Sequence, residues 1–156
     1  MSQPIQGKYF EEFEIGTVFR HAITRTVTET DNLLFTVMTM NTQPLHLDED
    51  YSKTQSVAGT RLCNSIFTLG LVIGVGVSEI TGSTTIANLG FTDITFPRPV
   101  LIGDTLHAET EVVDKRLSES RPNAGILSFE HRGYNQRNEL VARIRRTALM
   151  KRRPLE

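Results

Sequence analysis

The segment from Asn64 to Ile80 constrains the fold most strongly, because its apolar residues run nearly all the way round a helix. A helix of this kind is enclosed by the rest of the chain rather than lying on a surface. Gly70, Gly74 and Ser78 recur at every fourth position and form one smooth stripe. Since glycine in a helix costs stability, we expect the stripe to allow a close approach between this helix and a sheet.

The rest of the chain supplies that sheet. Residues 84–96, 104–115, 124–135 and 140–150 read as four strands, and in the second of them Leu106, Ala108, Thr110 and Val112 alternate with polar residues. Short connections favour antiparallel neighbours. The pattern therefore predicts an α+β fold in which an antiparallel sheet wraps one long central helix.

The N-terminal third of the sequence predicts shorter elements. Residues 8–28 look extended, and Thr28 is a good N-cap for a helix over 29–40 that has Asp31 in its first turn. Residues 41–50 form a polar loop around Pro44, and a helical turn is expected near 49–55.

Composition excludes several classes of function. The most apolar stretch, residues 66–77, is shorter than the roughly 20 residues of a membrane span, and the acidic N-terminus is unlike a secretory signal. A single cysteine, Cys63, excludes a disulfide framework and a cysteine-rich zinc site within one chain. A net charge of −1 disfavours nucleic acid as a partner. We expect a cytoplasmic protein of 156 residues with one domain and no metal or redox cofactor.

The charge is distributed unevenly. Residues 1–60 hold eight acids and four bases, whereas residues 121–156 hold nine bases and three acids. Solvated strand ends and a basic tail over 151–156 account for this gradient, and a local site for phosphate anions is the alternative.

Among the side chains that carry chemistry, His46 is the strongest candidate for acid–base work, because it follows Pro44-Leu45 in a polar loop beside the buried helix. His21 and His107 are expected at the surface, and His131 shares a face with Leu127 and Phe129 and is expected in the core. Cys63 is interpreted as a small core residue rather than a nucleophile.

Two stretches resemble a known family. Residues 28–51, TETDNLLFTVMTMNTQPLHLDEDY, and residues 86–111, IANLGFTDITFPRPVLIGDTLHAETE, are similar to segments of the MaoC-like dehydratases and (R)-specific enoyl-CoA hydratases. The resemblance covers residues 8–150 and implies the hotdog fold. Within the first stretch, the segment from Thr39 to His46 looks like a consistent subfamily variant and is similar to relatives of mesaconyl-CoA hydratase.

The resemblance implies catalytic positions, with two departures. It places the family's catalytic histidine at His46 and an oxyanion-binding backbone N–H at Gly59. The family's catalytic aspartate falls on Asn41, and the asparagine of its motif falls on Gln43. An amide can orient water but cannot accept its proton. His46 alone, or another acid such as Asp31 or Asp48, then has to act as the base.

Three functions remain open on this resemblance. The first is hydration or dehydration of an enoyl-CoA thioester with a branched or dicarboxylic acyl group, which we favour. The second is acyl-CoA thioester hydrolysis, and the third is binding of an acyl thioester without catalysis.

Substrate contacts and assembly complete the expectations. Phe91 and Phe96 are expected to wall an acyl slot. Arg61, Arg98 and Arg121 are candidates for contacts with the phosphates of CoA, which enters only as part of the substrate, although each is also an ordinary surface charge. Hotdog units pair through exposed sheet edges, so we expect a homodimer that has its acyl channel at the interface, with half of each site supplied by a second copy.

Overall fold

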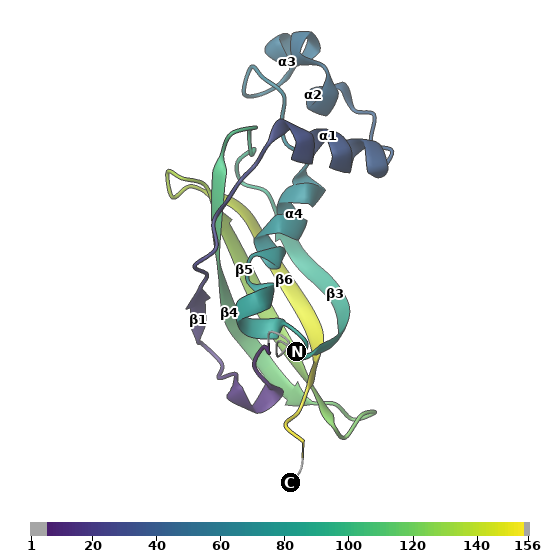
Figure 1. Cartoon of the computed structure of the whole chain (residues 1–156), viewed down its shortest axis with the longest axis vertical. Coiled ribbons are helices and arrows are strands. Elements are labelled where there is room, and N and C mark those ends of the chain that lie inside the picture. The colour runs from purple at the N-terminus through teal and green to yellow at the C-terminus, as the bar shows by residue number, and fades with distance from the viewer. Residues whose placement is uncertain (1–5, 155–156) are drawn as a thin grey trace, which may run out of the picture.

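The protein folds into an antiparallel sheet that curves around helix α4 (Figure 1). The computed structural model describes residues 6–154. The four long strands start and end within two residues of the predicted positions. Their bounds are β3 Thr85–Thr95, β4 Thr105–Leu117, β5 Ala124–Tyr134 and β6 Leu140–Lys151.

The N-terminal part adds short elements. The 3-10 turn η1 spans Phe10–Glu12, and the short strands β1 Val18–Arg20 and β2 Arg25–Thr26 both pair with β4. The predicted extended region over 8–28 is thus only partly strand. The sequence predicts a basic tail over residues 151–156. Residues 155 and 156 of this tail lie outside the described part of the chain.

The strand order is β1-β4-β5-β6-β3, and every pair is antiparallel. Strand β3 pairs with β6 rather than with β4, its neighbour in sequence. Alternation predicts which strand faces are buried, but it does not predict strand order. The observed order leaves β3 at one edge of the sheet.

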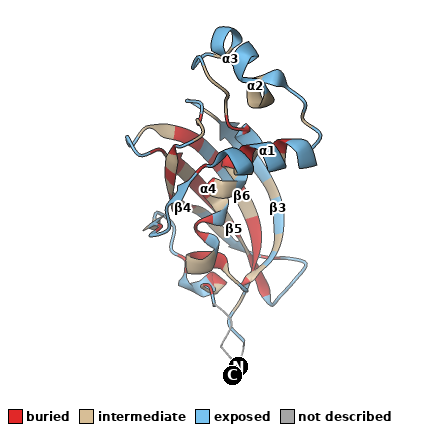
Figure 2. Cartoon of the chain, turned by 45° about the horizontal axis from the view of Figure 1, so that its top comes forward, coloured by how far each residue is buried: buried red, intermediate tan, exposed pale blue. Residues whose placement is uncertain are grey.

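The core lies between the sheet and α4. Figure 2 shows buried residues concentrated on the strands and much of α1 and α3 exposed. The alternating residues Leu106, Ala108 and Val112 of β4 are buried, as are Leu127 and Phe129 of β5. Burying one such large apolar side chain contributes about 1.5–3 kcal/mol. The pattern of the strands therefore accounts for much of the driving force for folding.

The central helix differs from its prediction in two ways. Helix α4 spans Ser65–Gly74, and the π-helical turn η2, Val77–Thr81, follows instead of a continuous helix to Ile80. The helix is also not enclosed on all sides, because Ile66 is 56% exposed.

The stripe formed by Gly70 and Gly74 was predicted to allow a close approach between helix and sheet, and within this single chain that prediction is wrong. A Cβ atom added at Gly70 or Gly74 would meet nothing within 4 Å. The close approach occurs instead at Gly76, where a Cβ would meet the ring of His21. The prediction that His21 lies at the surface is therefore also wrong, because that ring is buried against the backbone of the helical segment.

Three helices project beyond the sheet at the end where α4 begins (Figure 1). They are α1 Glu29–Met38, α2 Pro44–Leu47 and α3 Glu49–Gln55. Helix α1 starts as predicted, since Thr28 and Asp31 cap its first turn reciprocally. The region predicted as a polar loop around Pro44 contains the short helix α2, which starts on that proline. His46 accordingly lies on a helical turn and not on a loop.

No helix within residues 6–154 is both long and apolar enough to cross a membrane. The cytoplasmic location stays a prediction from composition.

Candidate functional site

A pocket of about 140 Å³ lies where α2, the start of α4 and the segment after β3 meet. Its lining is mostly apolar. It consists of His46, Leu62, Cys63, Ser65, Thr68, Phe96, Arg98, Pro99, Val100 and Val141. Two of the residues singled out by sequence for the acyl slot and its rim, Phe96 and Arg98, are therefore placed beside His46.

The imidazole of His46 is held in one orientation by the backbone. Its Nδ1 lies 2.9 Å from the carbonyl oxygen of Leu62. Because a carbonyl oxygen only accepts hydrogen bonds, Nδ1 carries the proton in the neutral ring, and Nε2 keeps its lone pair. The Leu62 N–H in turn donates to the carbonyl of Leu45 at 2.9 Å. This arrangement leaves Nε2 as the basic atom of a half-buried histidine.

The main chain of His46 is anchored by a buried amide that sequence reasoning missed. Asn32 is 1% exposed; its Nδ2 donates to the His46 carbonyl at 3.0 Å, and its Oδ1 accepts from the Asn64 N–H at 2.9 Å. Asn32 thus links α1, α2 and the residue that precedes α4. The signal in the sequence was its position four residues before Thr36, which is also buried, on the inward face of α1.

The first turn of α4 opens onto the pocket. Asn64 is its N-cap, and its side chain accepts from the Ile66 N–H at 3.0 Å. Ser65, the first residue of the helix, lines the pocket. The N-terminus of a helix carries partial positive charge from aligned peptide dipoles, so this end of the pocket favours negative charge.

Asn41 and Gln43 shape the turn that leads into α2. The Oδ1 atom of Asn41 accepts from the Gln43 N–H at 3.1 Å, and Gln43 is the N-cap residue of α2. The Asn41 N–H donates to the Thr36 carbonyl at 3.0 Å. Neither residue lines the pocket. The side-chain oxygen of Asn41 is thus engaged by the backbone that carries His46.

The two alternative acids are both occupied as helix caps. Burial opposes ionisation of Asp31, but hydrogen bonds from Thr28 and Arg25 outweigh it and lower the pKa of its carboxyl. Asp48 caps α3 by accepting from the Tyr51 N–H at 2.9 Å. Neither carboxyl lines the pocket, so the structure does not bring them to His46.

Other candidate residues fall at different places. The Gly59 N–H donates to the Ser56 carbonyl at 3.2 Å, and Gly59 does not line the pocket. Arg61 forms ion pairs at 2.9 Å with both Glu29 and Glu49, which couples it to acids rather than to the pocket.

Two further candidates are also distant from the pocket lining. Phe91 lies on the edge strand β3 and is 38% exposed. Arg121 lines a different pocket, at the end of the sheet opposite to His46.

Cys63 lines the pocket as a neutral thiol. Burial raises its pKa to about 11, so the thiolate that a cysteine nucleophile requires is not populated near neutral pH. This agrees with its interpretation as a core residue. No group of three or more potential metal ligands occurs among the residues described.

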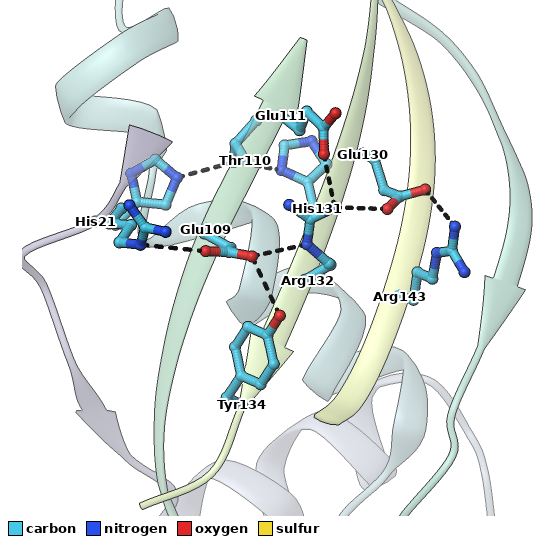
Figure 3. Close-up of polar contacts among 10 residues, drawn as sticks. His21, Glu109, Thr110, Glu111, Glu130, His131, Arg132, Tyr134 and Arg143 are labelled. Carbon is cyan, nitrogen blue, oxygen red and sulfur yellow. Dashed lines mark hydrogen bonds and ion pairs between the residues drawn. The ribbon is translucent and has the colours of Figure 1, made fainter. Parts of the chain in front are cut away.

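A second polar cluster lies inside the sheet, away from this pocket (Figure 3). His21 contacts Glu79 through Nδ1 at 2.7 Å and Thr110 through Nε2 at 2.8 Å, and Thr110 contacts Nδ1 of His131 at 2.8 Å. His131 is in the core, as predicted. Burial, with the nearby charge of Arg146, lowers its pKa to about 3, so it is neutral in the folded protein.

On the opposite face of the same strands, Arg132 donates to three glutamates (Figure 3). Burial alone would lower the pKa of Arg132, but Glu111, Glu109 and Glu130 together raise it. This network is a satisfied surface feature of β4 and β5 and offers no free acid or base.

Comparisons with known proteins agree on one family. The MaoC like domain matches residues 11–132. The chain is 26% identical over 147 residues to mesaconyl-CoA hydratase of Cereibacter sphaeroides, which covers 94% of this chain and 42% of that protein. It is 32% identical to the (R)-specific enoyl-CoA hydratase of Rhodospirillum rubrum, over 67% of this chain and 69% of that protein.

Solved structures give the same result. A Chloroflexus aurantiacus structure described as a putative MaoC domain protein dehydratase has a TM-score of 0.88 at 27% identity, covering 99% of this chain and 43% of that one. A Mycobacterium tuberculosis protein described as having a double hotdog fold has a TM-score of 0.83 at 26% identity, covering 95% of this chain and 45% of that one. The chain spans about two fifths of the length of the mesaconyl-CoA hydratases it matches. With its sheet wrapped around α4, this chain has the hotdog fold and belongs to the MaoC-like family.

Proposed function

We propose that this chain hydrates an α,β-unsaturated acyl-CoA, or dehydrates the corresponding 3-hydroxyacyl-CoA, with His46 as the acid–base group. The observation that carries the proposal is the hydrogen bond between Nδ1 of His46 and the Leu62 carbonyl, in an apolar pocket at the start of α4. The names of the relatives support it, since they include mesaconyl-CoA hydratase and β-methylmalyl-CoA dehydratase.

The proposed reaction needs one base and one site for negative charge. Nε2 of His46 removes a proton from water as the water oxygen bonds to the β-carbon. The electron pair of the double bond moves to the thioester, and the resulting enolate oxygen is stabilised at the N-terminus of α4. The imidazolium then returns the proton to the α-carbon, so that one water has been added and His46 is neutral again.

In this proposal, the backbone N–H of Ser65 takes the oxyanion role that the family resemblance assigned to Gly59. Ser65 lines the pocket, whereas the Gly59 N–H is bonded to Ser56. Asn41 acts by positioning His46 through the turn before α2, so no carboxylate is required at its position.

Arg98 supports a dicarboxylic acyl group as the substrate. It is the cation in the pocket lining, and its pairing with Glu139 is loose at 3.6 Å. A second carboxylate on the acyl group would gain a charge-assisted hydrogen bond there. We therefore expect Arg98→Ala to weaken turnover of mesaconyl-CoA about tenfold more than turnover of crotonyl-CoA.

The experiment is incubation of the purified protein with crotonyl-, mesaconyl- and methylcrotonyl-CoA, followed by mass spectrometry. Gain of one water by any of them is the expected result. Release of free CoA would instead identify a thioesterase. Binding without turnover of any of the three would identify a binding protein, and either of these outcomes would reject the proposal.

A further inference from the structure

A closed ring of hydrogen bonds joins His46 to the residue that caps α4. One half of the ring starts from the side chain of His46, whose Nδ1 donates to the Leu62 carbonyl at 2.9 Å. The other half starts from the main chain of His46, whose carbonyl accepts from Nδ2 of Asn32 at 3.0 Å. Asn32 in turn accepts, through Oδ1, from the Asn64 N–H at 2.9 Å. Since Leu62 and Asn64 both adjoin Cys63 in the chain, the backbone closes the ring.

Asn32 is the member of this ring whose side chain can be exchanged without touching His46. Leu62 and Asn64 contribute main-chain groups, which substitution does not remove. The two backbone groups that face Asn32 have opposite polarity, because a carbonyl only accepts hydrogen bonds and an N–H only donates them. A carboxamide carries a donor and an acceptor side by side, so it satisfies both groups in a single orientation. Because Asn32 is buried, water does not substitute for either bond.

The bond between Asn32 and Asn64 also affects which N–H group at the start of α4 is left for a ligand. The Asn64 N–H is engaged by Asn32, and the Ile66 N–H is engaged by the Asn64 side chain at 3.0 Å. Ser65 lies between these two residues and lines the pocket. Asn32 therefore connects the carrier of the proposed base directly to the residue that precedes the proposed oxyanion donor.

The helix that carries His46 has little stability of its own. Helix α2 has four residues, well below the roughly 12–15 residues at which an isolated helix becomes even marginally stable in water. Its position relative to α4 therefore depends on tertiary contacts, and the carboxamide of Asn32 is one that reaches both. Misplacement of a reacting group by about 1 Å can lower a rate roughly 100-fold. A change in this contact should accordingly appear in the rate of the reaction.

We propose that Asn32 is a positioning residue of the hydration reaction, because it holds the base at His46 and the oxyanion donor at Ser65 at one separation. The inference rests on the proposed function for the identity of the reaction. It assigns a role in setting the rate to α1, a helix none of whose residues lines the pocket. A purely structural amide would change only the fraction of folded protein, whereas a positioning amide changes the rate of each folded molecule.

The first test is steady-state kinetics of two variants, with the folded fraction checked by circular dichroism. Asn32→Leu keeps the approximate size of the side chain and removes both hydrogen bonds. Asn32→Gln keeps the donor and the acceptor but moves them by one methylene group. For both we expect kcat to fall at least about tenfold, because the separation changes. KM should stay within about threefold of wild type, because Asn32 does not line the pocket. Unchanged kcat in the folded variants, or a loss confined to KM, would overturn the inference.

Thr36→Val is the matched control. Thr36 lies one turn further along the inward face of α1, is buried, and places its hydroxyl 3.5 Å from Nδ2 of Asn64. The substitution removes a buried polar group of the same helix and leaves the ring of hydrogen bonds intact. We expect kcat within about twofold of wild type. A fall in kcat equal to that of Asn32→Leu would show that any buried change in α1 has this effect, and it would contradict the proposal.

The second test is a double-mutant cycle with His46. If Asn32 acts through the base, its loss has no further effect once the imidazole is absent. Asn32→Leu should therefore lower the residual kcat of His46→Ala less than about twofold, compared with at least about tenfold in the wild-type background. Equal factors in the two backgrounds would show that Asn32 acts independently of His46 and would overturn the inference.

Hydrogen exchange of backbone amides separates this inference from the proposed function, because it needs no substrate. The His46 N–H donates to the Gln43 carbonyl and the Leu62 N–H to the Leu45 carbonyl, so both report on the position of α2. In Asn32→Leu we expect these two amides to exchange about tenfold faster, with no such change in Thr36→Val.

The two proposals then fail in different ways. If the wild-type protein hydrates no thioester and the two amides still exchange faster in Asn32→Leu, the link between α2 and α4 stands and the hydratase proposal fails. If the wild-type protein hydrates a thioester and Asn32→Leu keeps its kcat, the hydratase proposal stands and the positioning role of Asn32 is rejected. Unchanged exchange of both amides in Asn32→Leu would also reject that role.

Discussion

At the residue scale, the orientation of His46 depends on a backbone carbonyl rather than on an acid. The Leu62 oxygen selects the tautomer with a basic Nε2, and Asn41 uses its side-chain oxygen to hold the preceding turn. These contacts explain how an amide is accommodated where the family motif has aspartate.

His46→Ala should lower kcat/KM for hydration by about 10²–10⁴-fold, because it removes the proposed general base. Steady-state kinetics with the best thioester from the substrate panel measures this. His107→Ala, which removes a histidine stacked on Tyr134 outside the pocket, is the control and should stay close to wild type. Comparable losses in both variants would indicate that His46 has no special role.

Asn41→Ala should lower kcat/KM about fivefold, the kinetic equivalent of about 1 kcal/mol for one lost hydrogen bond. Asn41→Asp keeps the acceptor oxygen for the Gln43 N–H and should stay within about threefold of wild type. A gain of tenfold or more in Asn41→Asp would contradict the positioning role and show that a carboxylate at this position is catalytic.

His131 makes stability depend on pH. Its pKa of about 3 in the fold lies below the ordinary value of 6.5, so the unfolded chain binds a proton that the folded chain refuses. Stability is therefore present above pH 6.5 and declines as the pH falls towards 3, by about 2 kcal/mol between pH 7 and pH 5. Urea unfolding at both pH values should show this decline, and His131→Gln should reduce it. An identical decline in the variant would contradict the assignment.

At the element scale, buried amides hold the projecting helices α1 and α2 to each other and to the start of α4. Asn32 bonds to α2 and to the N-cap of α4, and the Asn64 Nδ2 approaches Oγ1 of Thr36 at 3.5 Å. The pocket therefore depends on three helices keeping one relative position.

Asn32→Ala should destabilise the protein by about 2–4 kcal/mol, because it leaves the His46 carbonyl and the Asn64 N–H without their partner. Urea unfolding measures the loss. Gln55→Ala, at the exposed end of α3, is the control and should change stability by less than about 0.5 kcal/mol. A loss no larger than that of the control would show that the helices are held by other contacts.

At the scale of the whole molecule, the uneven distribution of charge along the sequence corresponds to two different ends of the structure. The helices around His46 include acids at Glu29, Glu49 and Asp50, and the far end of the sheet carries the basic pocket lined by Arg121. In the predicted homodimer, two-fold pairing through β3 would set the basic end of one copy beside the acidic end of the other, which would also favour antiparallel pairing electrostatically.

Leu89→Lys should convert the predicted homodimer to monomer, because it places a charge on the exposed edge of β3. Analytical ultracentrifugation measures the change, and activity on CoA thioesters should fall with it. Leu117→Lys adds the same charge at a similarly exposed leucine on β4 and should remain dimeric. If Leu89→Lys stays dimeric, β3 is not the interface.

Much of the fold follows from local pattern. Alternation located β4 and β5, Thr28 and Asp31 located the start of α1, and Pro44-Leu45-His46 identified the histidine that lines the pocket. These features depend on neighbours along the chain, where the periodicity of side chains and capping hydrogen bonds act directly.

Other features depend on contacts between segments that are distant in sequence. They are the position of β3 beside β6, the burial of His21, the open face of α4 and the hydrogen bonds of Asn32. The occupied N–H of Gly59 and the placement of Arg121 opposite to His46 are of the same kind. Packing of the assembled sheet against α4 settles them, because many strand orders satisfy one alternating pattern.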